Sequence, residues 1–511
     1  MERKKAWIDL ATFFAVVLVA NLISFQLYFR LDFTEDKQYT LSRATRDVLE
    51  DLDGIITVKA YFSEGLPPNL LKIRRDFADL LIEYEDRSDA ALVYEFINPN
   101  ESDEAEREAQ REGINPVLVN VRKRDKVEQI RGYMGAVLYQ ENNRETIPYV
   151  RPGSSMEYTL TTSIKKLIIQ DKPRVAFLQG YGEAPLEHLS DLSNHLSVLY
   201  ELIPFSLTDS VSLSVDRYKA VVWIAPKDTI DTPDFEKVNL YLQGGGNLFV
   251  AYNTLYGNMG TASLEKAPDI GLASWLGTLG IRLGREFITD ASCSPVTVTQ
   301  RQGPFLVNTQ VEFPYFPIIK SFGEHPIVKG LESVFLPFAS SVSLSRRDST
   351  WQVDNLLLTS ELTGAVAAPA PMNVQKEWTK DDFNVGVQPV ALAIEGRIRE
   401  GTDDPLSRLV LVSNGNFAVN GDPAQQGGRP QKLNPDNVNL AVNSIDWLAD
   451  DTGLIDLRTK GVTSRPIKDL EEGQKKLLKW TNVLLPVFLV LAYAFLRRQR
   501  RLYWRRRWLE S

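Results

Sequence analysis

The sequence predicts an α/β protein in which two successive α/β domains are flanked by one transmembrane helix at each end. Three observations predict this. A long hydrophobic run lies near each end of the chain, and strands alternate with helices between them. The 511 residues are 43% hydrophobic and 24% charged, which is typical of a water-soluble body. Membrane contact should therefore be confined to the two runs.

The two hydrophobic runs are residues 7–29 and 480–496. At about 1.5 Å rise per residue, the first is long enough to cross a bilayer core of roughly 30 Å, and the second lies at the short end of the spanning range. The alternatives are buried core helices or, for the first run, a cleaved signal peptide. No small-residue cleavage site follows Phe29, so we expect the first run to be kept as an anchor.

Charges next to the hydrophobic runs predict the orientation. Arg3, Lys4 and Lys5 precede the first, and a basic tail at 497–511 follows the second, with Arg497, Arg498, Arg500, Arg501, Arg505, Arg506 and Arg507. The positive-inside rule therefore predicts two cytoplasmic termini in a bacterial inner membrane. Residues 31–479, with 47 basic and 63 acidic residues, would lie outside the cytoplasm. We expect the tail to meet anionic lipids or a partner, and not nucleic acid.

Three polar residues interrupt the predicted transmembrane helices: Asn21 and Gln26 in the first, and Asn482 in the second. Polar side chains within a membrane often bond to neighbouring helices, so these positions are candidate partner contacts. The alternative is that they lie near the interfaces and touch water or lipid head groups.

Residues 31–170 form the first predicted domain. Strands are expected at 55–62, 91–97, 115–121, 133–140 and 145–150, and helices at 66–87, 101–112 and 157–169. This order is that of a thioredoxin-like domain, and the loop at 113–117 resembles the one that carries the cis-proline there, which predicts a cis bond before Pro116. No cysteine follows the first strand, so thiol redox catalysis is excluded.

Residues 171–455 form the second predicted domain, and 456–479 a linker. Apolar strands at 174–179, 220–225 and 247–251 alternate with helices at 185–200 and 232–242, which indicates a doubly wound parallel sheet. Later strands are expected at 356–359, 390–394 and 408–412, and a last helix at 437–449. The stretch 257–355 is less regular and should hold insertions.

Signals for catalysis are few. The chain has no Walker motif, and Gly180-x-Gly182 lacks the third glycine of a dinucleotide site, so we interpret it as a turn. His188, Asp191 and His195 share a helical face, but such spacing arises easily by chance, and we predict no metal or other cofactor. Cys293 lies in no nucleophile elbow. A Ser–His–Asp site is not excluded, although nothing indicates one.

Several segments resemble those of a known family. Residues 31–42 read LDFTEDKQYTLS. They are similar to the LDLTxxKxYTLS signature of the GldG family of ABC-transporter auxiliary proteins, and 56–63 continue the match. Residues 179–183 correspond to a segment that often reads Gly-His-Gly-Glu, 413–420 to GDSDFxxN, and 439–448 complete the resemblance. The chain departs from the family where Tyr181 replaces histidine and where Asn414 and Asn416 replace acids, which weakens any metal or acid–base role there.

The resemblance implies a non-enzymatic extracytoplasmic subunit of an ABC-2-type or gliding-associated system. Its partners would be a permease, a cytoplasmic ATPase, the membrane, and an envelope polymer or exported substrate. The second domain would be similar to class I glutamine amidotransferases without their nucleophile. Tyr181, Glu183, Asn414 and Asn416 are then the candidate ligand or partner surface. Two alternatives stay open: a periplasmic scaffold or polysaccharide-binding protein without a transporter, and a membrane-anchored hydrolase.

Overall fold

The computed structural model describes residues 40–449, except 124–125, 151–154, 169–170, 210, 303–304, 346–350, 398–404 and 423–430. Beyond 449 it describes helical positions scattered between 479 and 498, which belong to a separate unit. The first predicted anchor, with Asn21 and Gln26, and the tail residues Arg500 and Arg501 lie outside the described residues. Among the helices that are described, none has the length and hydrophobicity needed to span a bilayer.

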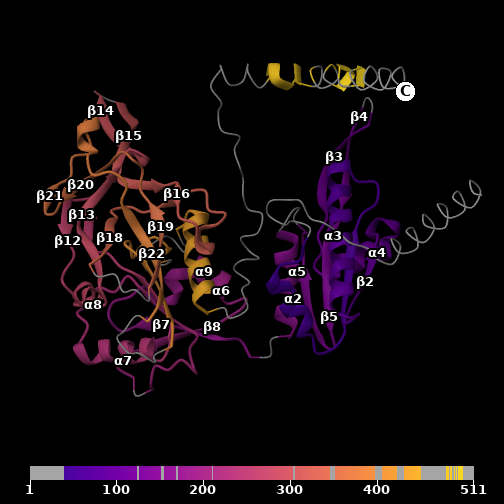
Figure 1. The fold of residues 1–511 in the computed structure, drawn as a ribbon, viewed down its shortest axis with the longest axis horizontal. Helices are drawn as coiled ribbons and strands as arrows, with labels where there is room; N and C mark the ends of the chain where they lie inside the picture. Colours follow the sequence, from indigo (N-terminus) through magenta and orange to yellow (C-terminus); the bar gives the residue numbers. More distant parts are fainter. Residues whose placement is uncertain are drawn as a thin grey trace, which may run out of the picture. The chain divides into compact units, whose positions relative to one another are not determined.

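A four-stranded sheet organises the N-terminal part of the chain (Figure 1). Its strand order is β2-β1-β5-β6; β1 and β2 run parallel, and β5 is antiparallel to both β1 and β6. The strands are β1 (Ile56–Phe62), β2 (Leu92–Ile97), β5 (Met134–Gln140) and β6 (Asn143–Ile147). The helices are α2 (Arg43–Glu50), α3 (Pro68–Arg87), α4 (Asp103–Arg111) and α5 (Ser155–Ile168), with a 3₁₀ turn η1 (Pro99–Glu101). The strands and helices predicted at these positions are confirmed, and α2 is a further helix that was not predicted.

Two details differ from the prediction. The strand expected at 115–121 is one half of a hairpin, β3 (Val117–Lys123) with β4 (Lys126–Gly132); in the described part of the chain these two strands pair only with each other. Among the described peptide bonds only Ala368–Pro369 is cis, so the prediction of a cis bond before Pro116 is wrong. Pro116 leads directly into the extended strand β3 and occupies no tight turn, where a cis proline is usually found.

Ser42, the last residue of the 31–42 segment, caps helix α2 and links its start to α5. The Ser42 side chain caps the helix by accepting a hydrogen bond from the Thr45 N–H at 3.1 Å. The Ser42 N–H donates to Glu157 Oε1 on α5 at 2.7 Å, and the Thr45 hydroxyl donates to the same oxygen at 2.8 Å. Glu157 and Thr45 are buried. This end of the signature therefore has a structural role.

An eight-stranded sheet organises the second part, in the order β16-β19-β22-β23-β10-β9-β7-β8. The five adjacent strands β8, β7, β9, β10 and β23 are parallel. If these five strands are numbered along the chain, their order across the sheet is 2-1-3-4-5, which is a doubly wound order. The strands are β7 (Arg174–Gln179), β8 (Glu201–Ser206), β9 (Ala220–Ile224), β10 (Leu248–Ala251), β16 (Ser321–Phe322), β19 (Gln352–Leu358), β22 (Pro389–Gly396) and β23 (Ser407–Val412).

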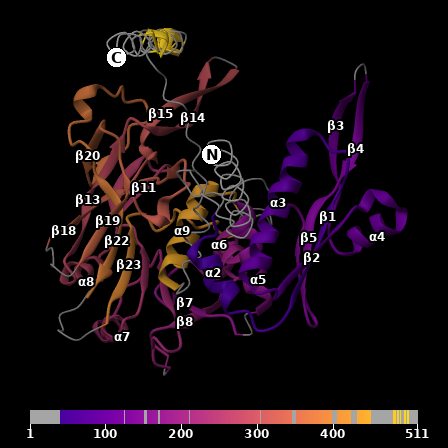
Figure 2. The same cartoon turned by 45° about the vertical axis from the view of Figure 1, so that its right-hand side comes forward.

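Helices cover both faces of this sheet (Figures 1 and 2). Alternate residues of one strand enter opposite cores: Val175 and Phe177 pack toward α6 and α9, whereas Ala176 and Leu178 pack toward α7 and α8. The helices are α6 (Ser190–Leu196), preceded by η2 (Leu186–Leu189), α7 (Thr232–Gln243), α8 (Leu272–Thr278) and α9 (Pro435–Ala449). Burial on both faces explains why β7, β9, β10 and β23 are largely apolar.

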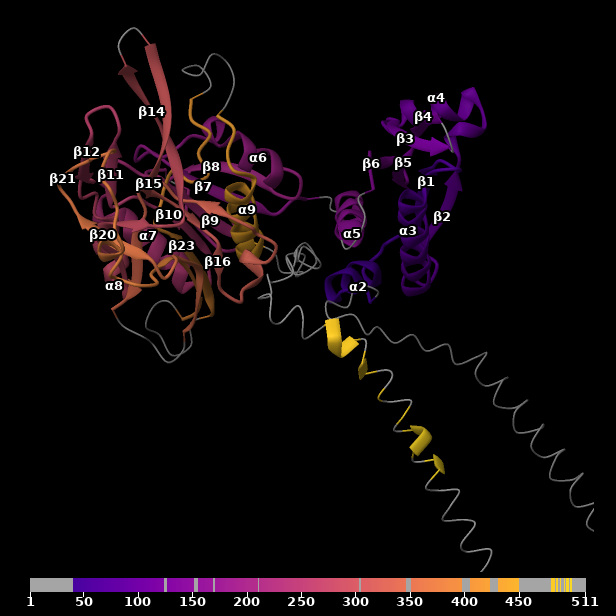
Figure 3. The ribbon, with the colours of Figure 1, turned by 90° about the horizontal axis from the view of Figure 1, so that it is seen from above.

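The stretch 257–355 is more regular than predicted, because it contributes to small antiparallel sheets. They are β11-β12-β21, β18-β13-β20 and β14-β15-β17. Strands β14 and β15 form a long hairpin that projects from the rest (Figure 3). The bounds are β11 (Leu255–Asn258), β12 (Ser263–Lys266), β13 (Ile281–Asp290), β14 (Cys293–Gln302), β15 (Phe305–Ile319), β17 (Val334–Phe335), β18 (Ser340–Leu344), β20 (Thr363–Ala367) and β21 (Ala370–Pro371), with 3₁₀ turns η3 (Pro326–Val328) and η4 (Lys380–Asp382).

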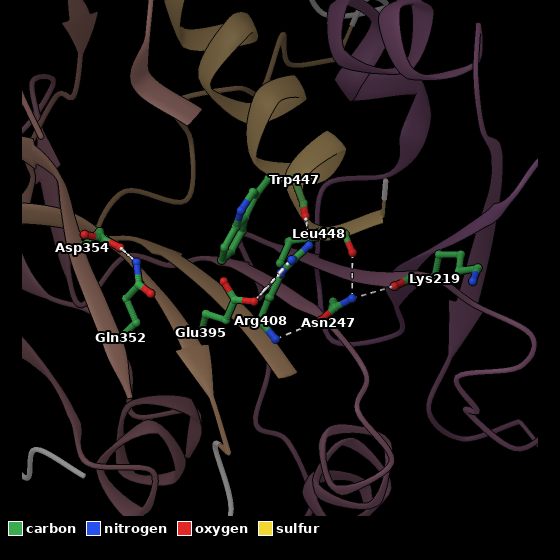
Figure 4. A network of polar contacts seen from close by, with 8 residues as sticks. All are labelled: Lys219, Asn247, Gln352, Asp354, Glu395, Arg408, Trp447 and Leu448. Atoms are coloured by element: carbon green, nitrogen blue, oxygen red, sulfur yellow. Dashed lines mark hydrogen bonds and ion pairs between the residues drawn. The ribbon is translucent and has the colours of Figure 1, made fainter. Parts of the chain in front are cut away.

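The C-terminal end of α9 is held against the sheet by a polar network (Figure 4). Arg408 Nη1 donates to the Trp447 carbonyl oxygen at 3.0 Å, and its guanidinium lies 5.0 Å from the centre of the Trp447 ring. The same guanidinium pairs with Glu395 at 3.3 Å, and Asn247 Nδ2 donates to the Leu448 carbonyl oxygen at 2.7 Å. These contacts satisfy two carbonyl groups that the helix end would otherwise leave unpaired.

Candidate functional site

The carboxyl ends of β7, β9, β10 and β23 lie side by side, which is where doubly wound proteins bind ligands. Hydrogen bonds join the loops that leave them. The N–H of Lys227, after β9, donates to the Tyr181 carbonyl oxygen at 2.8 Å, and the N–H of Gly415, after β23, donates to Asn253 Oδ1 at 2.9 Å. The four predicted surface residues all belong to two of these loops.

Glu183 holds the loop after β7. Its side chain is buried, with Oε1 accepting from Trp223 Nε1 at 2.9 Å and Oε2 accepting from the Tyr181 N–H at 2.7 Å. Two strong donors from β9 and from the loop itself therefore occupy both carboxylate oxygens. The arrangement turns the carboxylate toward the protein framework.

Tyr181 is also buried, and its hydroxyl donates to Asp234 at the start of α7. Burial, together with the nearby Asp234 carboxylate, raises the pKa of Tyr181 well above its usual value. Burial alone would raise the pKa of Asp234, but hydrogen bonds from Lys237, at 2.8 Å, and from Tyr181 lower it. A neutral tyrosine bonded to an ionised aspartate is a stable structural pair and a poor general base.

The loop after β23 carries Asn414 and Asn416. Asn414 is buried; its Nδ2 donates to the Pro337 carbonyl oxygen and its Oδ1 accepts from the Asn416 N–H at 2.9 Å. The Asn416 side chain is exposed. Of the four residues predicted to form a surface, three are therefore buried in hydrogen-bond networks and one faces solvent.

Ala225, directly after β9, has a left-handed backbone with φ 53°. Such a conformation costs a non-glycine residue about 1–2 kcal/mol, and it often marks a functional turn. In a nucleophile elbow a residue on a strained strand end carries the reactive group, whereas alanine has none. A Cβ at Gly415 would lie 3.0 Å from the Ala225 Cα, so the two loops pack closely here. The sequence around Ala225 contains no glycine that could have indicated this turn.

The histidine-containing helix face is tied into a loop. Asp191 Oδ2 accepts from Asn420 Nδ2 at 2.7 Å, and the Asp191 N–H donates to Asn420 Oδ1 at 3.1 Å. His195 Nδ1 lies 2.7 Å from the Asp191 carbonyl oxygen, and His188 Nε2 lies 3.9 Å from Asp422. In the part of the chain that the structure describes, no three His, Cys, Asp or Glu side chains are grouped as metal ligands.

Two family models match the chain. Residues 172–444 match the family described as ABC-type uncharacterized transport system, and residues 35–139 match a domain of unknown function, DUF7088. An uncharacterized protein of Borreliella burgdorferi is 20% identical over 461 residues, covering 86% of each chain.

Among solved structures, the mmIFT52 N-terminal domain aligns with 54% of this chain and 97% of its own, at 12% identity and TM-score 0.34. A ThuA-like protein from Parabacteroides merdae aligns with 55% of this chain and 91% of its own, at 13% identity and TM-score 0.28.

The family match at residues 172–444 spans 273 of 511 residues, more than half of the sequence. The protein therefore belongs to the ABC-type transport system auxiliary family.

Proposed function

We propose that this protein is a non-enzymatic, extracytoplasmic auxiliary subunit of an ABC-2-type transporter, similar to GldG. The observation that carries the proposal is the family match over residues 172–444. The permease and the cytoplasmic ATPase would be separate chains, because this sequence has no Walker motif and only two long hydrophobic runs. Purification of the full-length chain in mild detergent, followed by identification of bound proteins, tests the association.

Membrane anchoring is the second part of the proposal. The described helical positions between 479 and 498 carry large apolar side chains that are exposed. Their exposed fractions range from 51% for Leu485 to 67% for Phe488, and such exposure is unfavourable in water. Arg497 and Arg498, both exposed, follow them. Both features suit a helix that crosses lipid and ends in a basic cytoplasmic tail. Asn482, also exposed, is the polar position there that we assign to partner contact.

The domain assignments are part of the same proposal: a thioredoxin-like domain at 31–170 and an amidotransferase-like domain at 171–455. The order β2-β1-β5-β6, with one parallel pair and helices between the strands, supports the first. The doubly wound order of β8 to β23 supports the second. A non-enzymatic role is consistent with two features: the first domain has no cysteine for thiol redox catalysis, and the second has Ala225, without a reactive group, at its strained strand end.

The binding surface on the second domain would then include fewer of the four candidate residues than the sequence indicated. Asn416 is exposed and would contact a ligand or partner directly, whereas Tyr181, Glu183 and Asn414 would hold the loops around it. A scaffold that binds envelope polysaccharide without a transporter is the alternative; pull-down on isolated cell wall, compared with co-purification of transporter subunits, separates the two.

A further inference from the structure

Strand β2 lies at one end of the four-stranded sheet, and among the described strands only β1 pairs with it (Figure 3). Its sequence, Leu-Val-Tyr-Glu-Phe-Ile, is apolar and β-prone except for Glu95. Exposed, apolar edge strands readily pair with another chain, and most proteins protect them. Strand β2 is therefore suited to pair with a further strand.

Backbone hydrogen bonds show which groups of β2 point outward. The Ile56 N–H donates to the Ala91 carbonyl oxygen at 2.8 Å, so residues 91, 93, 95 and 97 face β1, while 92, 94 and 96 face away. The outward N–H of Leu92 donates to Ser88 Oγ at 3.0 Å. For Tyr94 and Phe96, no hydrogen bond from a described residue reaches the outward backbone groups.

One edge strand of the larger sheet, β8, is protected, in contrast with β2. In β8 the Glu201 N–H donates to the Pro173 carbonyl oxygen, so residues 202, 204 and 206 face outward. The central outward-facing residue is Pro204, which has no N–H to donate and therefore prevents another strand from pairing there. β2 has no proline and a single charged residue.

We propose that β2 pairs with β2 of a second copy of this chain, antiparallel, about a two-fold axis at Tyr94. In this register Tyr94 lies opposite Tyr94 of the second copy, and Phe96 lies opposite Leu92. The free N–H and C=O groups of Tyr94 pair reciprocally, and each Phe96 N–H donates to the Leu92 carbonyl oxygen of the other copy. The result is one continuous eight-stranded sheet across two protomers.

The position of the charge favours this register over the next one along the strand. With the axis at Tyr94, each Glu95 lies opposite Val93, an apolar residue that is 36% exposed. With the axis one residue further, the two Glu95 side chains would lie directly opposite each other, which is unfavourable. In the register centred on Tyr94, a second copy therefore pairs with the edge without opposing like charges, as a self-complementary interface requires.

A charge swap at Val93 tests the register. Val93→Glu places a carboxylate opposite each Glu95 and should weaken dimerisation of the full-length chain in mild detergent by on the order of tenfold. Val93→Lys places an amine opposite Glu95 and should strengthen it by a comparable or smaller factor. Sedimentation equilibrium gives the dimer dissociation constants, and thermal unfolding checks that both variants fold. A wild-type chain that is monomeric throughout, or two variants that dimerise like wild type, overturns the proposal.

Cross-linking gives a second readout. In a Cys293→Ser background, Tyr94→Cys should form an intermolecular disulfide, because opposed residues in hydrogen-bonded antiparallel pairs lie about 5.5 Å apart between Cα atoms. Leu118→Cys, at a side chain 61% exposed on β3, is the matched control and should not cross-link efficiently. Equal cross-linking at the two positions, or protection of position 94 by a different protein, contradicts self-pairing.

Discussion

The buried carboxylate of Glu183 accepts a hydrogen bond from the indole Nε1 of Trp223 at 2.9 Å. This contact joins the loop after β7 to the neighbouring strand β9, at the edge where a ligand site was expected. It assigns Glu183 to the framework of that edge. The stability of substituted chains can test this assignment directly.

Glu183→Ala should lower the free energy of unfolding by about 2–4 kcal/mol, because the Trp223 indole and the Tyr181 N–H would both lose their acceptor in a buried site. Asn416→Ala is the matched control on the same edge; its exposed side chain should change stability by less than about 0.5 kcal/mol. Urea unfolding followed by tryptophan fluorescence measures both. Similar losses for the two variants would contradict the division into framework and surface.

Substitution of Arg408 should loosen the end of α9. Arg408→Ala removes the hydrogen bond to the Trp447 carbonyl and the contact with its ring, and should cost about 2 kcal/mol. Arg408→Lys keeps the charge without the planar fork and should cost less. Amide hydrogen exchange at 444–449 should accelerate in the alanine variant. Unchanged exchange there would show that Arg408 does not hold the helix end.

Ser42→Ala should cost about 1 kcal/mol, the usual effect of losing an N-cap. Glu157→Ala should cost more, because it leaves the Ser42 N–H and the Thr45 hydroxyl without their acceptor. Exposed Asp47, on the same helix, provides the control substitution Asp47→Ala. If transporter association is lost while stability is unchanged in Ser42→Ala, the signature has a direct binding role instead.

Alkaline pH should destabilise the protein through buried tyrosines. Burial raises the pKa of Tyr252 to about 12, above the value near 10 of an unfolded chain. The unfolded state therefore loses this proton first, so the contribution is intact below pH 10 and is lost as the pH rises toward 12. Tyr252→Phe should flatten the decline in thermal midpoint between pH 10 and 12. A decline of unchanged slope would exclude Tyr252 as a contributor.

Sequence patterns predicted the buried strands well because β1, β7, β9, β10 and β23 are short apolar runs, whose burial follows from composition. They missed β8, where Pro204 argues against a strand, and β4, the half of the β3–β4 hairpin that is rich in charge.

The candidate site was predictable only in part. The sequence placed Tyr181 and Glu183 after one strand and Asn414 and Asn416 after another, and the sheet order brings those strand ends to one edge. Which side chains turn inward depends on partners far away in the chain: Trp223 is 40 residues from Glu183, and Pro337 is 77 from Asn414. Periodicity within a segment contains no information about such contacts.

Identification of the proteins that co-purify with the full-length chain tests the central claim most directly. An affinity-tagged chain extracted in mild detergent should retain a polytopic permease and an ATPase with Walker motifs in defined stoichiometry. The triple variant Asn21→Leu, Gln26→Leu and Asn482→Leu, which keeps the anchors apolar but removes their polar contacts, should retain less of both. Recovery of the wild-type chain without either protein, from cells that contain both, would contradict the account.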